Sequence, residues 1–401
     1  MSSRELLALS DIISVKHGYA FPGSGFSEND SFPTLLTPGN FQIGGGFREA
    51  QAKTFAGDIP QEYRLRSGDL IVTMTDLSKE GATLGLPALV PESGVYLHNQ
   101  RVGLVGIKDP SRVTAAFLHY FLRGSHYRAH ILGTASGSTV RHTSPSRIGA
   151  FIANLPKLDE QRAIAEVLGA LDHKIAVNTI LARSAVALAS ATFDRESKKA
   201  RPVRLGDVAT VVLGGTPSRA RPGYWSNGTV PWMASGKANE DRILRPTSLI
   251  TEEALAQSAA KMMPKGATVI AITGATLGQI SRLEIEACGN QSLVGAWGET
   301  TWESAWLNFA IRSELLQLLR AATGAAQQHV NKADVKNLMI PWVDERALRA
   351  WGRLAGELLE RARQADVESH SLIILRDELL PDLMSGRLCV KGAERIVEGK
   401  V

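Results

Sequence analysis

With 401 residues, the chain is too long for one ordinary hydrophobic core and predicts two or three domains. Its 44% hydrophobic and 21% charged residues exclude a disordered or fibrous protein, and a formal net charge of +5 suits a polyanionic partner without requiring one. The only cysteines, Cys288 and Cys389, lie in unrelated contexts, which excludes a disulfide framework or a cysteine zinc site and fits a reducing cytoplasm.

We expect neither a secretory leader nor a membrane span. The N-terminal residues lack the apolar core of a signal peptide, and no stretch reaches the roughly 18 apolar residues of a transmembrane helix. The most apolar segment, 181–193, is short, alanine-rich and contains Arg183. It is therefore predicted to be a helix of a soluble protein.

The first part of the chain is predicted to mix short strands and helices. Gly68 provides a turn before the apolar run at 70–73, and a second apolar run covers 102–107, both typical of strands. A helix is expected near 112–122. Pro156 followed by an acidic pair predicts a further helix start, because carboxylates in a first turn complement the helix dipole.

That further helix carries a coiled-coil pattern. Apolar and small residues recur at alternating steps of four and three, as in a helix that pairs with another helix. These positions are Ile164, Leu168, Leu171, Ile175, Asn178, Ala182, Ala185, Ala189 and Thr192. The charged segment 195–202 ends in a proline, and a second globular part begins at residue 203.

The second globular part repeats landmarks of the first in the same order. A mixed α/β domain with short strands and a helix near 302–319 is therefore predicted twice. The matching features, first copy first, are 9–18 with 205–214, Gly68 with Gly266, Asn99-Gln100 with Asn290-Gln291, Gly137 and His142 with Gly324 and His329, and 155–162 with 340–346.

A second long helix follows the second copy and shows the same periodicity. Its seam positions are Leu348, Trp351, Ala355, Leu358, Ala362, Ala365, Ser369, Leu372, Arg376 and Leu379. Each long helix is expected to run about 35 residues, roughly 50 Å at 1.5 Å per residue. They could pack separately as ordinary amphipathic helices, but alanine seams favour close pairing of two helices.

Three segments resemble the specificity subunits of type I restriction-modification systems. The first runs from Leu205-Gly-Asp-Val-Ala through Gly214-Gly-Thr-Pro217 and Tyr224-Trp225 to Pro231-Trp232, and it is similar to that family's opening of a target recognition domain. The segments 158–175 and 375–386 are similar to the family's central and C-terminal conserved helices. The first copy departs from the pattern, since Gly18-Tyr-Ala-Phe21 replaces the Gly-Gly-Thr-Pro sequence.

The resemblance implies duplicated α+β recognition domains joined by two long antiparallel helices that form a coiled coil. The implied domains are recognition domain 1 at 1–157, the central helix and linker at 158–200, recognition domain 2 at 201–342, the C-terminal helix at 343–388 and a tail at 389–401. The implied partners are double-stranded DNA and two modification subunits, with a restriction subunit left open. S-adenosylmethionine and ATP would bind those partners, so this chain would hold no cofactor and no metal.

Candidate DNA contacts lie in polar loops, where donors and acceptors can reach bases or phosphates. In the first copy they are Asn99, Gln100, Arg101, Ser138, Thr139, Arg141 and His142. In the second copy they are Thr273, Gly274, Thr276, Gln291, Gln327, Gln328, His329 and Lys332. Gln327 and Gln328 suit adenine best, because a glutamine amide can bond both adenine edges.

Structural roles compete with DNA contact at several of these positions. The recurring Asn-Gln pair is a candidate for a shared turn, and each single histidine for a structural hydrogen bond. The segment 273–278 could hold phosphate or simply end a strand. The aromatic residues Tyr224, Trp225 and Trp232 are expected in the core rather than against a flipped base.

The sequence is also compatible with two other functions. A DNA methyltransferase with its own reading domain would need an Asn/Asp-Pro-Pro-aromatic motif, which does not occur, and 41–47 is the only glycine cluster that invites a cofactor. The other is a coiled-coil scaffold that does not bind DNA. Salt-dependent duplex binding would distinguish it from a DNA reader.

Overall fold

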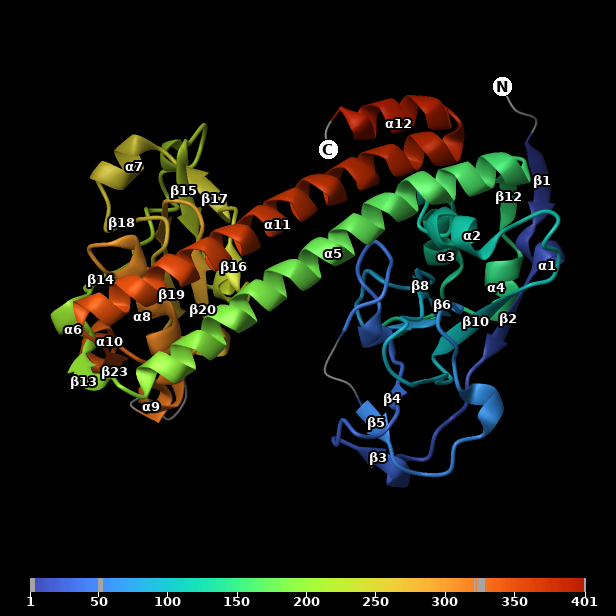
Figure 1. Ribbon diagram of the computed structural model, residues 1–401. Coiled ribbons are helices and arrows are strands. Elements are labelled where there is room, and N and C mark those ends of the chain that lie inside the picture. Colours follow the sequence, from blue (N-terminus) through green and yellow to red (C-terminus); the bar gives the residue numbers. More distant parts are fainter. Residues whose placement is uncertain (1–3, 50–52, 321, 323–328, 400–401) are drawn as a thin grey trace. The chain divides into compact units, whose positions relative to one another are not determined.

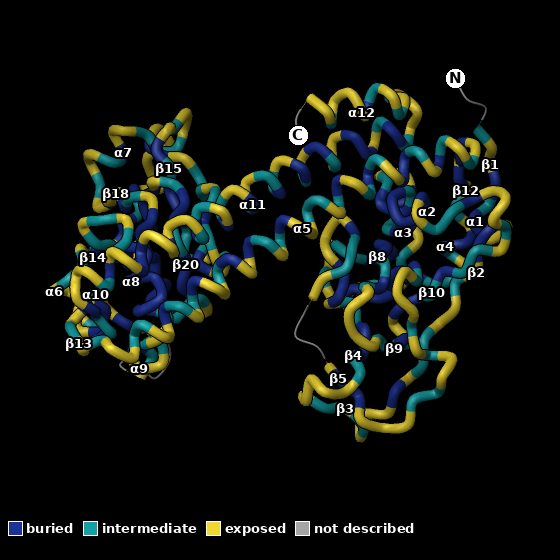
Figure 2. Tube along the Cα trace, viewed as in Figure 1, coloured by how far each residue is buried: buried dark blue, intermediate teal, exposed yellow. Residues whose placement is uncertain are grey.

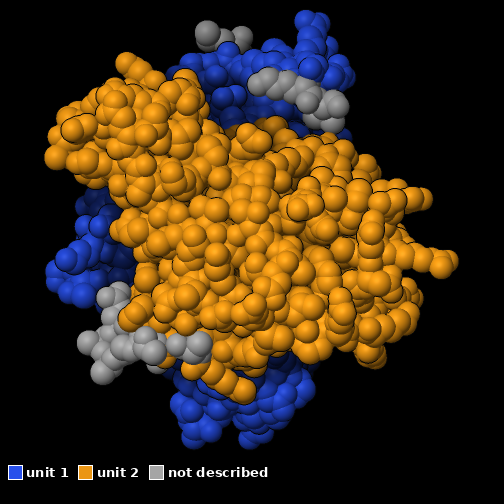
Figure 3. Space-filling model, turned by 90° about the vertical axis from the view of Figure 1, so that its left-hand side faces the viewer, with its two compact units in different colours: residues 1–174, 372–401 blue, residues 175–371 orange. Residues whose placement is uncertain are grey.

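The computed structural model describes residues 4–49, 53–320, 322 and 329–399 (Figure 1). The chain divides into two compact units, one formed by Met1–Lys174 with Leu372–Val401 and the other by Ile175–Ser371 (Figure 3). Each unit contains one globular domain and part of each of the two long helices.

In its described residues the first unit contains two four-stranded sheets, one antiparallel and one mixed, and two short strand pairs. One sheet has the order β2-β10-β6-β8 and the other β3-β5-β4-β9, while β1 pairs with β12 and β7 with β11. The strands are β1 (Glu5–Ala8), β2 (Ile13–His17), β3 (Phe26–Ser27), β4 (Thr34–Leu35), β5 (Lys53–Phe55), β6 (Leu70–Thr73), β7 (Thr75–Asp76), β8 (Pro87–Leu89), β9 (Tyr96–Leu97), β10 (Val102–Ile107), β11 (Arg141–His142) and β12 (Ile152–Leu155). Its short helices are α1 (Leu9–Ile12), α2 (Ala115–Phe121), α3 (Ser125–Thr134) and α4 (Pro145–Gly149).

The second unit has sheets β14-β22-β19-β20-β16 and β17-β15-β21-β18 and the strand pair β13-β23. The strands are β13 (Arg201–Arg204), β14 (Thr210–Leu213), β15 (Val230–Met233), β16 (Arg242–Ile243), β17 (Ser248–Ile250), β18 (Met262–Met263), β19 (Thr268–Ala271), β20 (Ile280–Leu283), β21 (Ala287–Gly289), β22 (Leu293–Trp297) and β23 (Met339–Trp342). Its short helices are α6 (Leu205–Val208), α7 (Glu252–Ala256), α8 (Thr301–Ser313), α9 (Leu315–Arg320) and α10 (Lys332–Asn337).

The two domains share one topology, which confirms the predicted duplication and the mixed α+β class. The antiparallel order β2-β10-β6-β8 recurs as β14-β22-β19-β20. The parallel pair of the second sheet recurs too, as β4 with β9 and as β15 with β21. In both copies a glycine with positive φ, Gly68 or Gly266, turns the chain into a fully buried central strand, β6 or β19.

The long helices are α5 (Leu158–Ser197) and α11 (Glu345–Ser385). A further helix, α12 (Val390–Glu398), follows α11 in the segment 389–401, for which the sequence predicts only a tail. At 40 and 41 residues they exceed the predicted 35. Within the second unit they run antiparallel, because Asn178 bonds Glu368 while Thr192, fourteen residues later, bonds Trp351. Alanines line this pairing, with Ala182, Ala185, Ala362 and Ala365 forming one buried cluster.

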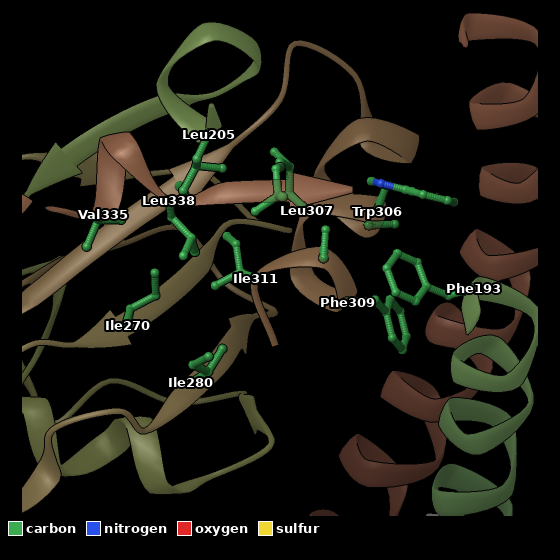
Figure 4. Packing of buried hydrophobic residues seen from close by; sticks show 14 of the residues in the cluster. Phe193, Leu205, Ile270, Ile280, Trp306, Leu307, Phe309, Ile311, Val335 and Leu338 are labelled. Atoms are coloured by element: carbon green, nitrogen blue, oxygen red, sulfur yellow. The ribbon is translucent and has the colours of Figure 1, made fainter. Parts of the chain in front are cut away.

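The main core of the second unit lies where its helices meet the first of its sheets. Phe193 of α5, Trp351 of α11 and Trp306 of α8 pack together with residues of β19 and β22. Figure 4 shows Phe193, Trp306 and Ile270 of β19 among the residues of this cluster. Exposed positions face outward along both long helices (Figure 2). Each helix therefore buries one stripe and exposes the rest, as the seam pattern predicts.

Helix α5 differs in one respect from the sequence expectation about membranes. It contains an 18-residue window of mean hydropathy 1.4, which by length and composition could cross a membrane. Its Ala182, Ala185, Ala189 and Phe193 are nevertheless buried in the protein core. Only 22% of that window is buried, and Val177, Ile180 and Leu188 of α5 are exposed, so packing against α11 and the sheet accounts for only part of the apolar character of the helix.

Candidate nucleic-acid interface

A hollow of about 550 Å³ in the first unit brings together three of the predicted DNA-contact residues. Gln100 and Arg101 reach it from the turn before β10, and His142 from β11. The other lining residues are His17, Gly18, Ala20, Met74, Thr75 and Thr143. A neighbouring hollow of about 250 Å³ shares Gln100 and Arg101 and adds Asn99 and Lys53.

The Asn99 turn is built by side-chain and backbone contacts. The Asn99 Oδ1 atom accepts a hydrogen bond from the backbone N–H of Arg101 at 3.2 Å. Gly18 packs so closely that an added Cβ would lie 2.2 Å from the Asn99 carbonyl oxygen. Asn99 therefore shapes the turn, and the side chains of Gln100 and Arg101 are exposed to solvent.

The backbone of β11 places His142 at the rim. Arg141 and His142 pair antiparallel with Asp76 and Thr75, and the N–H of Thr143 donates to the Met74 carbonyl at 3.0 Å. The His142 Nδ1 atom forms a hydrogen bond with the Thr75 hydroxyl at 3.3 Å. His142 therefore has a structural partner, although the residue is exposed to solvent.

The remaining candidates of the first unit lie beside the hollow without lining it. Ser138 and Thr139 are exposed in the turn closed by the Ser136–His142 bridge. Arg141 is half-buried and its Nε donates to the Lys79 carbonyl at 3.1 Å. The Arg141 side chain thus bonds the protein itself, whereas the hydroxyls of Ser138 and Thr139 are exposed and accessible to a ligand.

A buried carboxylate supports this side of the hollow. Asp76, on β7, is 5% exposed and accepts hydrogen bonds from the N–H of Ser78 and from the N–H and hydroxyl of Thr83. Burial alone would raise the pKa of Asp76, but the hydrogen bonds from Thr83 and Ser78 outweigh it and lower the pKa below the usual 3.8. The charged form is therefore the one that the fold prefers.

We expect Asp76→Asn to destabilise the first unit by about 2 kcal/mol at neutral pH, because an amide cannot accept all these charge-assisted hydrogen bonds. The folded pKa is depressed, so this contribution is present above the unfolded pKa and is lost as pH falls through the folded value. Urea unfolding at pH 7 and at pH 3 measures it, with the exposed Asp58→Asn as control. A penalty that stayed constant down to pH 3 would contradict the role of the charge.

The second unit rebuilds the same frame with different side chains. Thr273 pairs with His329, and the Val330 N–H donates to the Ile272 carbonyl at 2.9 Å, as Thr143 does to Met74. The Asn290 Oδ1 atom accepts from the Ser292 N–H at 3.1 Å, which repeats the turn of Asn99. An added Cβ on Gly214 would lie 2.2 Å from the Asn290 carbonyl.

Other predicted residues of the second unit occupy turns around this frame. Gly274 and Thr276 form a 3-10 turn after Thr273, in which the Thr276 hydroxyl donates to the Thr273 carbonyl at 3.2 Å. Gln291 is exposed and accepts from the Thr216 hydroxyl, and Lys332 begins α10. Gln327 and Gln328 lie outside the described residues.

Sequence reasoning missed several residues that line the hollow, among them His17, Ala20 and Thr75. Thr75 follows the predicted strand by two residues, and its pairing with His142 depends on a contact across 67 positions. The repeat offered a usable signal, because His17 lies within the segment 9–18, which aligns with 205–214 of the second copy.

The predicted seam residues lie on the inner faces of the long helices, and each is buried or half-buried. In the second unit Asn178 donates to Glu368 at 2.8 Å and Trp351 donates to Thr192 at 3.2 Å. In the first unit Ile164, Leu168 and Leu171 of α5 are buried, as are Leu372 and Leu379 of α11.

Ionic contacts hold each globular domain on its helices. In the first unit Asp172 of α5 accepts from the Tyr120 hydroxyl at 2.8 Å and from Arg376 of α11 at 2.6 Å. Burial alone would lower the pKa of Arg376, but Asp172 raises it above the usual value. In the second unit Arg242 donates to Asp366 of α11 at 2.7 Å. Both domains are thus fixed to the helices by charge-assisted bonds.

Parts of the chain are similar in sequence to known proteins. Residues 197–345 match the family model described as the type I restriction modification DNA specificity domain. The chain is 25% identical over 142 residues to the type I restriction enzyme EcoR124I/EcoR124II specificity subunit of Escherichia coli, covering 34% of this chain and 35% of the relative. It is 26% identical over 165 residues to the EcoBI specificity subunit of Escherichia coli, covering 41% of this chain and 31% of the relative. The matches thus span about a third of each relative's length.

The fold likeness extends along nearly the whole chain. The crystal structure of a type I restriction-modification system S subunit from M. genitalium superposes with a TM-score of 0.61 at 14% identity, covering 95% of this chain and 96% of that one. Residues 197–345 are thus similar to the type I restriction modification DNA specificity domain, and the fold of the chain is similar to that of a solved S subunit of such a system.

Proposed function

We propose that this chain reads a bipartite DNA target, with one half-site contacted by each globular domain. The observation that carries the proposal is the recurrence of one frame in both units. In each, an Asn-Gln turn accompanies a histidine that pairs with a threonine two residues after a central strand, Thr75 after β6 and Thr273 after β19. Gln100 and Gln291 are exposed in both copies, whereas Arg101 of the first corresponds to Ser292 of the second. A shared frame with different side chains suits two domains that read different sequences.

As the specificity subunit of a type I restriction-modification complex, the chain would use its long helices as the scaffold on which the other subunits assemble. Two modification subunits would dock on this chain and perform adenine methylation, and a restriction subunit would bind where the system cleaves. S-adenosylmethionine and ATP would then be bound by those partners, and this chain would recognise DNA without catalysis in the cytoplasm.

Arg101→Ala is expected to weaken duplex binding about 5- to 150-fold, because Arg101 is an exposed guanidinium beside Gln100 and His142 and such contacts contribute about 1–3 kcal/mol. The measurement is the affinity of the chain, assembled with its modification subunits, for duplexes that carry the methylated motif. Arg162→Ala, which removes an exposed arginine from α5, is the matched control.

Mapping methylated adenines in cells that express the assembled complex tests the proposal as a whole. A motif of two specific halves separated by a non-specific spacer is expected. A complex that assembles but methylates without sequence preference, or binds duplexes without salt dependence, would contradict DNA reading by this chain.

A further inference from the structure

An arginine of the second unit is stacked on a tryptophan and presented to solvent. The guanidinium carbon of Arg219 lies 3.4 Å from the ring centroid of Trp225 and 5.5 Å from that of Trp232. The two indole rings meet edge to face, with centroids 5.0 Å apart. Arg219 is itself exposed, so its position is set by the aromatic ring rather than by burial.

Hydrogen bonds fix the two rings under this arginine. The indole N–H of Trp232 donates to the Gly215 carbonyl at 3.1 Å, and that of Trp225 donates to the Ser218 carbonyl at 3.3 Å. The N–H of Gly215 in turn donates to the Gly289 carbonyl at the end of β21. The loop 214–225 is therefore tied to the sheet at its start, and the bond between Trp225 and Ser218 braces it internally.

The loop adjoins the candidate DNA-contact frame of the second unit. The Thr216 hydroxyl donates to the Oε1 atom of Gln291, in the turn that follows β21. Arg219 comes three residues after Thr216 in the same loop. The stacked arginine thus belongs to the surface that carries Gln291.

Arg219 keeps its hydrogen-bonding capacity for a ligand. Within the described part of the chain, no carboxylate lies within 4.0 Å of its guanidinium group. A guanidinium stacked by its face leaves its planar edge of N–H donors free, and this edge matches two phosphate oxygens. Stacking also reduces the side-chain entropy lost on binding.

The first unit offers a comparable arrangement with lysine. Lys16 lies 4.8 Å above the ring of Tyr63, which packs against Tyr19 directly after the equivalent glycine, Gly18. A cation over an aromatic ring beside the Asn-Gln turn is therefore present in both copies, although the residues that build it differ.

We propose that Arg219 binds a phosphate of the DNA backbone and that Trp225 is its positioning residue. A phosphate suits this arginine better than a base edge, because stacking on Trp225 holds the side chain against the protein surface instead of extending it into a groove. Phosphate contacts set the register of a domain on the duplex without selecting sequence. The inference rests on the proposed function and identifies a residue that acts beside Gln291.

The test compares duplex affinities of the full-length chain, assembled with its modification subunits, over a series of salt concentrations. Arg219→Gln is expected to weaken binding about 3- to 10-fold for all sequences and to reduce the salt slope by about one. Arg219→Lys retains the charge and is expected to retain most of the slope. Arg245→Gln removes another exposed arginine, one that stacks on no ring in the described chain, and should leave affinity and slope unchanged.

The positioning role of Trp225 is tested by a double-mutant cycle. Trp225→Leu should weaken binding in the parental chain but add little in the Arg219→Gln background. Folding of each variant is checked by hydrogen exchange of β15 and β21. Equal affinities for Arg219→Gln and the parent would overturn the proposal, as would a variant whose methylated motif relaxed at one base. Failure of the parent itself to bind would instead refute the proposed function.

Discussion

Replacement of Trp351 by alanine is expected to destabilise the second unit by about 3–5 kcal/mol, the usual cost of removing a buried tryptophan. Trp351 of α11 is 4% exposed, and its ring centroid lies 5.1 Å from that of Trp306 and 5.6 Å from that of Phe309. Its indole N–H also donates to the Thr192 hydroxyl of α5 at 3.2 Å. One side chain therefore links both long helices to α8.

Hydrogen exchange measures this effect locally. Amides of α8 and β22 are expected to exchange about a hundredfold faster or more in Trp351→Ala, whereas those of β6 and β10 in the first unit should not change. Leu354→Ala, one turn further along α11 at a side chain that is 44% exposed, is the control and should have little effect. Equal protection of α8 in the parent and in Trp351→Ala would show that the cluster contributes little.

The long helices were predictable from the sequence because their packing repeats along one dimension. The steps of three and four pick out Leu168, Ala182 and Ala189 on α5, and all three are buried. The same pattern could not give the helix ends, since both helices continue beyond the predicted 35 residues, α11 even through Pro381. Periodicity reports which face is buried, whereas helix ends depend on local capping and tertiary contacts.

The candidate site was less accessible to sequence reasoning. The repeat correctly aligned Asn99 with Asn290 and His142 with His329, because the same backbone frame recurs in both copies. It could not show that His17 meets His142 at one hollow, since that neighbourhood is created by sheet order rather than by spacing. Whether a side chain such as Arg141 faces solvent or bonds the protein likewise depends on the fold.

A four-residue insertion into α5 between Leu168 and Ala189 is expected to lengthen the non-specific spacer of the DNA target by one or two base pairs. Helix α5 is one unbroken helix that contributes to both units, residues up to Lys174 to the first and the rest to the second. Four residues add about 6 Å of rise and about 40° of net rotation to a helix. In DNA, one base pair contributes about 3.4 Å of rise and about 35° of rotation.

Mapping methylated adenines in cells that express the variant with its partners measures the spacer directly. Both half-site sequences should persist, because neither globular domain is altered, while the distance between them grows. The control inserts the same four residues at Ser93, in an exposed loop of the first unit, and should keep the parental spacer. Recovery of the parental spacer from the α5 variant would mean that α5 length does not determine the distance between half-sites, and that this distance is set by the modification subunits instead.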